Sequence, residues 1–236
     1  GHEIIGWVRD EKRARALLGA DVSLVPGAAS SESVLAALKR SDAVIHLAGA
    51  PIMGRWTRRK KRQIRDSRVA LSEDLVSTIA SLSKSQRPET IVSASAVGFY
   101  GDRGQEALTE DSPIEDQSLP MRERFMSSLC NDWEAAVAHA STHGLRTVSL
   151  RIGIVLAIDG GALLPLARLT KLGLGGKMGD GKQYMPWIHL EDLVELFVFA
   201  LNNTELSGII NAVAPEAVQN KTFAKSIADT LNRPCV

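Results

Sequence analysis

The sequence predicts a doubly wound α/β fold, in which helices cover both faces of a parallel sheet. Short apolar runs alternate with longer amphipathic segments along the 236 residues, which is the pattern of strand–helix–strand units. The run 43–47 (AVIHL) is almost wholly apolar, as strands buried on both faces of a parallel sheet are. Ligands of such sheets bind beyond the carboxyl ends of the strands. We therefore expect the loops that follow the strands to carry the chemistry.

The elements are expected in alternating order along the chain. Apolar runs predict strands at 3–8 (EIIGWV), 21–25 (DVSLV), 43–47, 90–95, 146–151 and 208–213. Amphipathic periodicity predicts helices at 11–18, 31–39, 57–82, 125–141, 162–172, 191–202 and 221–231. Ser30 or Ser31 is expected to cap the second helix. We expect a nucleotide-binding region over 1–155 and a small substrate-side C-terminal region over 156–236, within one globular unit.

Composition excludes several classes of protein. Hydrophobic residues make up 44% and charged residues 23% of the chain, and the net charge is 28 − 27 = +1. This balance gives no global field that would recruit nucleic acid or a membrane surface. No apolar stretch approaches the ~18 residues that a membrane span needs. Cys130 and Cys235 have no CxxC spacing, so we expect reduced thiols and a cytoplasmic location.

Two arginines are candidate anion ligands. Arg9 ends the first visible strand. In dinucleotide-binding folds the end of the second strand meets the adenosine ribose, and an arginine there accommodates a 2′-phosphate; a solvated loop arginine is the alternative. Arg68 lies on the apolar stripe of the helix 57–82, formed by Ile64, Leu71, Leu75, Ile79 and Leu82. A charge on that stripe needs a partner, which is either a phosphate or a carboxylate.

The surrounding basic run, 55–68 (RWTRRKKRQIRDSR), holds eight Lys or Arg residues. It is interpreted first as a solvated helix face and second as an anion site. Nucleic-acid binding ranks last, because the run contains one aromatic residue and the chain is nearly neutral.

Polar and small residues follow two of the inner strands. The segment 46–52 (HLAGAPI) runs from a strand into small residues, which let a ligand approach the backbone closely. In 91–102 (IVSASAVGFYGD), hydroxyl groups stand at the carboxyl end of a strand, where they can bind a substrate oxygen or hydrogen-bond the backbone.

A glycine-rich segment at 172–193 (LGLGGKMGDGKQYMPWIHLEDL) follows a helix rather than a strand, so it is not a dinucleotide-binding loop. We expect a turn or hairpin on the substrate side of the cleft, with Lys182, Gln183 and Tyr184 as candidate substrate contacts. A purely structural turn is the alternative. His189 is expected to be a core or cleft histidine on the substrate side rather than a metal ligand, because no second metal ligand stands at a useful spacing. Glu191 and Asp192 suit the start of the next helix.

Taken together, these stretches resemble one branch of the extended short-chain dehydrogenase/reductases, the epimerase family. GHEIIGWVRD, AVIHLAGAPI, RWT…SR, SASAVGFYGD, DWEAA and the glycine-rich segment occur in the same order in that family. The resemblance implies a Rossmann-like fold and an NADP(H) site. The cofactor-binding residues that it implies are Val8, Arg9, Leu47, Ala48, Gln63, Arg68 and Val155.

The sequence departs from the family pattern in two places. No GxxGxxG loop follows any of the first strands, so we expect that roughly the first 20–25 residues of the nucleotide-binding unit, a strand and its helix, are missing. The family's Tyr and Lys, four residues apart, are also absent: Met126 and Cys130 stand in their places. Ser95 matches the catalytic serine, and water or Tyr100 is then expected to handle the proton.

The resemblance thus implies an NADP(H)-binding oxidoreductase or epimerase-like protein. Its expected partner is a small-molecule substrate, such as a carbonyl compound or a sugar nucleotide, and not nucleic acid, a membrane or a metal. The alternative is a sensor or scaffold that binds NADP(H) but has lost the chemistry, which the missing Tyr–Lys pair favours.

Overall fold

The computed structural model describes residues 2–114 and 120–235. The chain divides into two compact units. The first comprises Gly1–Ser93 and Asp132–Thr147, and the second comprises Ala94–Asn131 and Val148–Val236. This division interleaves the two halves of the chain, whereas the sequence predicts two successive regions. The nucleotide-binding and substrate-side roles of residues 1–155 and 156–236 stay predictions.

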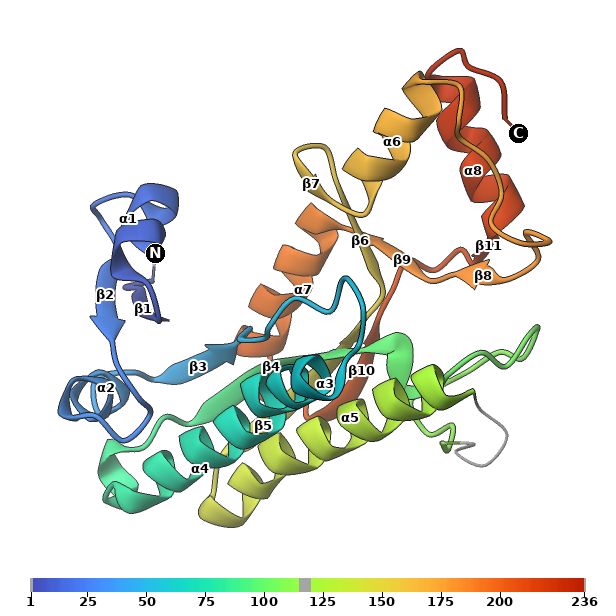
Figure 1. Ribbon diagram of the computed structural model, residues 1–236. Helices are drawn as coiled ribbons and strands as arrows, with labels where there is room; N and C mark the ends of the chain where they lie inside the picture. The colour runs from blue at the N-terminus through green and yellow to red at the C-terminus, as the bar shows by residue number, and fades with distance from the viewer. Residues whose placement is uncertain (1, 115–119, 236) are drawn as a thin grey trace. The chain divides into compact units, whose positions relative to one another are not determined.

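A four-stranded parallel sheet confirms the predicted α/β class (Figure 1). Its strands are β3 (Ala43–His46), β4 (Thr90–Ala96), β5 (Arg146–Ile152) and β10 (Gly208–Ala212), in the order β10-β5-β4-β3. In the register of the outer pairs, Ala43 lies opposite Thr90 and Gly208 opposite Val148. The inner strand β4 is buried over Thr90–Ser93, as its apolar sequence predicts.

The first unit also contains a two-stranded parallel sheet, β1 (Ile5–Val8) with β2 (Ser23–Pro26). Helices α1 (Glu11–Leu18) and α2 (Glu32–Leu38) follow these strands. Asp10 caps α1 by accepting a hydrogen bond from the Arg13 amide at 2.9 Å. Ser31, one of the two predicted caps, accepts a hydrogen bond from the Val34 amide and begins α2.

The predicted helix 57–82 is interrupted by a π-helical turn. Regular α-helix occupies α3 (Arg58–Arg65) and α4 (Leu71–Ser81), and the π turn covers Asp66–Ala70. The Leu71 amide donates to the Asp66 carbonyl, five residues back. The turn shifts the buried face of the helix: Ser72 is fully buried while Leu71 is only half-buried. A stripe of strict 3.6-residue period cannot anticipate that shift.

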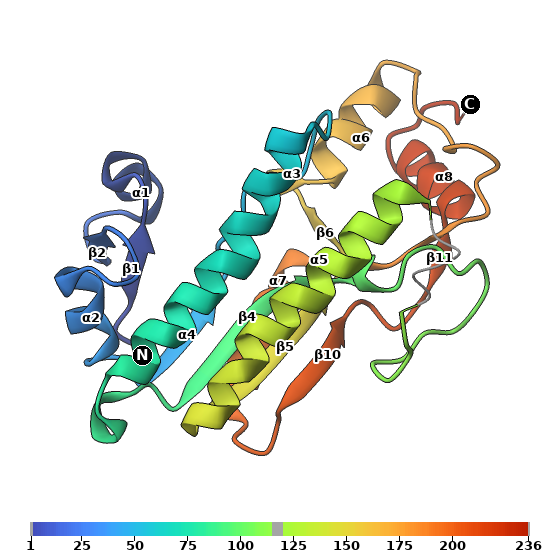
Figure 2. The same ribbon diagram turned by 60° about the horizontal axis from the view of Figure 1, so that its bottom comes forward.

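Helix α5 (Met121–Ala138) continues into a 3₁₀ turn at His139–His143. Its C-terminal part lies beside α4 in both views (Figures 1 and 2). Two further 3₁₀ turns lie at Lys84–Gln86 and Val97–Phe99. The core of the first unit is built mainly by side chains of α3, α4, β4 and α5: Ile64, Leu75, Val76, Ile79, Ile91, Val92, Trp133 and Val137.

The second unit holds several short strands that the sequence did not predict. β7 (Gly160–Gly161), β6 (Ile154–Ala157) and β9 (Trp187–His189) form one sheet, and β8 (Tyr184–Met185) pairs with β11 (Val218–Gln219). Strands of two to four residues are too short for a period to emerge. The predicted helices are present as α6 (Leu163–Lys171), α7 (Leu190–Asn202) and α8 (Asn220–Thr230), and Glu191 and Asp192 lie in the first turn of α7.

Candidate functional site

The carboxyl end of β1 is followed directly by an arginine. Val8 is half-buried in the strand and pairs with Pro26. Arg9 comes next, is exposed, and its guanidinium forms no hydrogen bond or ion pair with any residue that the structure describes. A nearby hydrogen bond from Trp7 Nε1 to the Gly27 carbonyl, at 2.9 Å, holds the ends of β1 and β2 together. The guanidinium of Arg9 is therefore available to an external anion.

The segment after β3 is held to the π turn. Leu47 is 63% exposed, Ala48 is half-buried and Ala50 is buried. The Ala50 amide donates to Ser67 Oγ at 2.8 Å, and Arg68 Nη1 donates to the Ala50 carbonyl at 3.1 Å. The predicted contacts Leu47 and Ala48 thus lie on a short stretch whose far end is anchored.

Arg68 is half-buried, as its place on the apolar stripe suggests. Its guanidinium donates hydrogen bonds to backbone carbonyls. Besides Ala50, Nη1 reaches the Ile64 carbonyl at 3.3 Å. Its Cζ lies 5.3 Å from the centre of the Trp133 ring, a cation–π arrangement. Gln63 is exposed on α3. The structure therefore brings Arg68 to the post-β3 segment, while a role for Gln63 stays a prediction.

His46, the last residue of β3, is buried against the same helix. Its Nε2 lies 3.0 Å from Ser72 Oγ, and that hydroxyl donates to the Arg68 carbonyl at 2.6 Å. Because the single hydroxyl proton is used there, His46 Nε2 is the donor to Ser72. Burial, and secondarily the Arg68 charge, lower the pKa of His46 from 6.5 to about 4. The imidazole is thus neutral at neutral pH.

In the second unit, Tyr100 and Arg151 form a buried polar network. The Tyr100 hydroxyl donates to Asn211 Oδ1 at 2.7 Å and accepts from Arg151 Nη1 at 2.9 Å. Arg151 also donates to the Glu110 carbonyl and lies 3.3 Å from the centre of the Phe99 ring. Only 4% of Tyr100 is exposed. Its hydroxyl is therefore already engaged both as donor and as acceptor, and a catalytic role for Tyr100 stays a prediction.

The predicted catalytic serine and the two replaced family positions also lie in this unit. Ser95 is buried near the end of β4. Cys130, where the family has lysine, is 1% exposed and packs with Phe99 and Tyr100, and Met126 is half-buried. Neither position offers a group that could lower the pKa of a tyrosine.

The glycine-rich turn is fastened to the start of α8. Asn220 Oδ1 accepts from the Met178 amide at 2.7 Å, and the Asn220 amide donates to the Gln183 carbonyl at 2.8 Å. Gly181 has φ of +73°, and a Cβ there would lie 2.9 Å from the Cβ of Lys221. Glycine is required at that position both for its backbone conformation and for close packing.

The predicted substrate contacts surround this turn. Lys182 is exposed, with Nζ 3.9 Å from Asp180 Oδ2, and Gln183 Nε2 donates to the Met178 carbonyl. Tyr184 is 41% exposed on β8. His189 is exposed rather than a core residue, and it caps α7 through a 3.4 Å contact between Nδ1 and the Glu191 amide. Val155, one of the predicted cofactor contacts, lies within β6 and pairs with Ile188.

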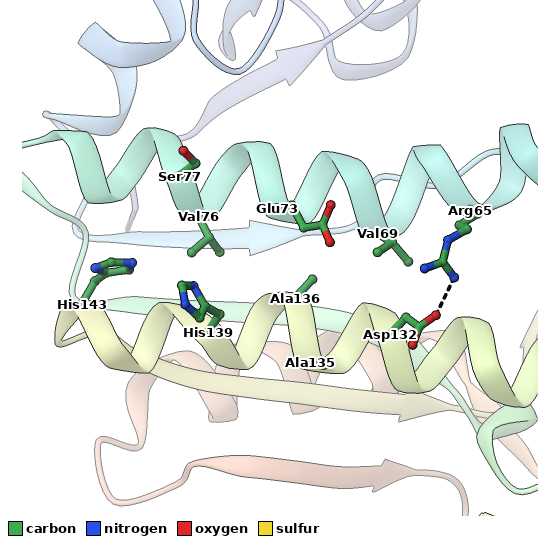
Figure 3. A pocket seen from close by; sticks show the side chains of 10 residues that line it. All are labelled: Arg65, Val69, Glu73, Val76, Ser77, Asp132, Ala135, Ala136, His139 and His143. Carbon is green, nitrogen blue, oxygen red and sulfur yellow. Dashed lines mark hydrogen bonds and ion pairs between the residues drawn. The ribbon is translucent and has the colours of Figure 1, made fainter.

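A pocket of about 610 Å³ lies between α4 and α5 in the first unit (Figure 3). Arg65 and Asp132 form an ion pair at one end, and His139 and His143 line the other. None of the predicted site residues lines this pocket. It is a groove between two outer helices, distinct from the ends of the strands.

Comparison with known proteins places this geometry in a family. A family model described as the NAD dependent epimerase/dehydratase family matches residues 1–212. The chain belongs to that family. The match confirms the resemblance drawn from the sequence motifs and agrees with the parallel sheet.

Two curated relatives of this epimerase family chain carry the words epimerase family protein in their names. The chain is 35% identical over 194 residues to the chloroplastic SDR39U1 homolog of Arabidopsis thaliana, covering 82% of this chain and 54% of that protein. It is 37% identical over 198 residues to YfhF of Bacillus subtilis, covering 84% of this chain and 62% of that protein. The chain thus spans 54% and 62% of the length of these two relatives.

Solved structures of the family share the fold. The human epimerase family protein SDR39U1 (isoform 2) with NADPH has 28% identity and a TM-score of 0.79, covering 100% of this chain and 74% of that one. A nucleoside-diphosphate sugar epimerase from Corynebacterium glutamicum has 32% identity and a TM-score of 0.73, covering 97% of this chain and 50% of that one.

Three residues of this epimerase family chain that support the candidate site were not predicted from the sequence: Ser67, Ser72 and Asn220. Each uses a side-chain oxygen to hold a backbone group or a neighbouring side chain of a predicted site segment. The signals for Ser67 were its place beside Arg68 and in the motif RWT…SR. For Ser72 and Asn220 no local pattern was available, because their partners are distant along the chain.

Two negative findings concern the described part of the chain. No helix there is long and apolar enough to cross a membrane. Residues 2–114 and 120–235 also contain no group of three or more His, Cys, Asp or Glu side chains that could hold a metal ion.

Proposed function

We propose that the chain is the NADP(H)-binding part of an epimerase-type oxidoreductase that acts on a carbonyl compound or a sugar nucleotide. The observation that carries the cofactor choice is the exposed guanidinium of Arg9 at the carboxyl end of β1, which no described residue pairs with. A guanidinium at that place suits the 2′-phosphate that distinguishes NADP from NAD. The likeness to the human protein with NADPH supports the same choice.

Each residue has a simple task in this proposal. Val8 and Arg9 hold the adenosine end, and the backbone at Leu47 and Ala48 lies along the cofactor. In the second unit, Ser95 holds the reacting oxygen of the substrate, and Lys182–Tyr184 and His189 contact the rest of it. The cofactor, when bound, supplies or accepts the hydride. Gln63, Arg68 and Val155 complete the proposed cofactor contacts.

Titration of the full-length protein with NADPH and NADH tests the cofactor assignment. We expect Arg9→Ala to weaken NADPH binding by about tenfold or more, because a charge-assisted contact to the phosphate is lost, and to leave NADH binding unchanged. Lys39→Ala is the matched control: Lys39 is exposed in the same unit, so the same charge is removed elsewhere. Equal affinities of wild type and Arg9→Ala for NADPH contradict the proposal.

A second candidate is a sensor or scaffold that binds NADP(H) without turnover. It is favoured by the engaged hydroxyl of Tyr100 and by the apolar setting of Cys130. Assays of the full-length protein with NADPH and panels of carbonyl compounds and sugar nucleotides separate the two. Turnover that Ser95→Ala abolishes without changing NADPH affinity supports the enzyme. NADPH binding with no turnover on any substrate supports the sensor.

A further inference from the structure

We propose that Ser67 is a positioning residue of the cofactor site: with Arg68, it clamps Ala50 from the π-helical turn and so presets the backbone of the Leu47–Gly49 segment. The identity of the ligand received by this segment rests on the proposed function. The clamp itself rests only on contacts within the first unit. Arg68, proposed above as a cofactor contact, also acts here through the segment that it anchors.

The backbone amide and the backbone carbonyl of buried Ala50 each form a hydrogen bond with a side chain of the π turn, Ser67 and Arg68 respectively. The Ala50 amide donates to Ser67 Oγ at 2.8 Å, and the Ala50 carbonyl accepts from Arg68 Nη1 at 3.1 Å. Ala50 is 1% exposed, so water cannot replace either partner without local opening. The Ser67 hydroxyl is itself fixed, since it donates to the Ile64 carbonyl at 2.9 Å.

The π turn is what brings two neighbouring residues to one target. In a regular α-helix, consecutive side chains are separated by about 100° around the axis. Ser67 and Arg68 lie within Asp66–Ala70, where the helix departs from that spacing. π-helical turns inside α-helices are rare and are found frequently at functional sites. The position of this turn therefore agrees with a role in shaping the loop opposite it.

Gly49 completes the arrangement, because it leaves room for the guanidinium. A Cβ built on Gly49 would lie 2.8 Å from both Cζ and Nη2 of Arg68. The φ of Gly49 is not in the left-handed region, so the need for glycine there is steric. An alanine at position 49 would displace Arg68 while leaving Ser67 untouched.

The N-terminal end of the Leu47–Gly49 segment is also anchored, because His46, which precedes it, contacts the helix that carries the π turn. His46 hydrogen-bonds Ser72, and Ser72 donates to the Arg68 carbonyl. The His46 ring also meets the edge of Trp133, on whose face the Arg68 guanidinium lies. Only Leu47, Ala48 and Gly49, between the two anchors, are exposed or half-buried. Such a preset segment binds a ligand without first losing conformational freedom.

The experiment compares Ser67→Ala, Ser67→Thr and Ser81→Ala in the full-length protein. Ser81 is the matched control, since its hydroxyl donates to the carbonyl three residues back, like that of Ser67, but is not part of the clamp. Two quantities are measured: the exchange rate of the Ala50 amide hydrogen by NMR without cofactor, and the dissociation constant for NADPH.

We expect Ser67→Ala to accelerate Ala50 exchange and to weaken NADPH binding, each by about tenfold, the scale of one buried hydrogen bond. Ser67→Thr, which keeps the hydroxyl, should restore both quantities, and Ser81→Ala should change neither. If Ser67→Ala does not fold, Ser67→Cys, whose thiol is a much weaker hydrogen-bond partner, takes its place, with the same expected effect on both quantities.

The outcomes separate this inference from the proposed function. Unchanged Ala50 exchange in Ser67→Ala overturns the clamp, whatever the ligand. Faster exchange with unchanged NADPH affinity overturns the positioning role. A wild-type protein that does not bind NADPH overturns the proposed function, while Ala50 exchange still tests the clamp.

Discussion

At the scale of single residues, His46 shows how burial decides protonation. The sequence places it at the end of an apolar strand, and the structure encloses it between Ser72 and Trp133. A neutral imidazole can donate from Nε2 to Ser72 without carrying a charge into the core. Burial and the nearby Arg68 charge both disfavour protonation, which is why the pKa falls to about 4.

This lowered pKa makes stability depend on pH. Between pH 6.5 and about 4, the unfolded chain binds a proton at His46 that the folded protein does not. Lowering the pH through this range therefore favours unfolding. We expect the free energy of unfolding to fall by about 3 kcal/mol across it, and not to fall further from this cause below pH 4.

Urea denaturation at a series of pH values between 4 and 7 measures the effect. The matched variant is His46→Gln, whose amide can still donate to Ser72 but does not titrate. Its unfolding free energy should lack this component of the pH dependence. The same pH dependence in both proteins would show that His46 is not its source.

At the scale of elements, the glycine-rich turn and α8 behave as one piece. Gly173, Gly179 and Gly181 in this segment have positive φ, and Gly181 also packs closely against Lys221 of α8. Two backbone hydrogen bonds, Asn220 to Gln183 and Lys221 to Gly181, join the segment to the first residues of α8. The Asn220 side chain adds two more, accepting from the Met178 amide and donating to Met185 Sδ.

We expect Asn220→Ala to destabilise the protein by about 1–3 kcal/mol, because the Met178 amide loses its acceptor and a buried side chain is removed. Exchange of the Met178 amide hydrogen should accelerate at the same time. The control is Asn202→Ala, at the exposed end of α7. Thermal unfolding and amide exchange measure both effects, and a variant that unfolds like the wild type would mean that the backbone bonds alone hold the turn.

At the scale of the whole molecule, the family fold is present, and the edge of its sheet is apolar. In the strand order of the described residues, β3 stands at one end of the four-stranded sheet. Ile45 on that strand is 45% exposed. An apolar edge strand is a template for pairing with another chain.

We expect the isolated 236-residue chain to self-associate through this edge. Ile45→Lys should reduce association, because a charged edge residue opposes strand pairing, and it should leave the unfolding midpoint nearly unchanged. Leu169→Lys, at a similarly exposed position on α6, is the control and should associate like the wild type. Light scattering across a concentration series distinguishes the variants; equal association of Ile45→Lys and wild type would exclude the edge.

The α/β class, the family, the parallel strands and the approximate helices could all be predicted from the sequence, because they depend on short-range periodicity and on motif order. Arg9 and Arg68 could be identified as candidate site residues in the same way, but their hydrogen-bond partners in the folded protein could not be predicted. Arg9 has no partner among the described residues, Arg68 reaches the Ala50 carbonyl, and Ser67 and Asn220 hold backbone from distant segments. The π turn, the short strands and these contacts emerge only in the folded chain, because they depend on how separate segments pack, and local periodicity does not carry that information.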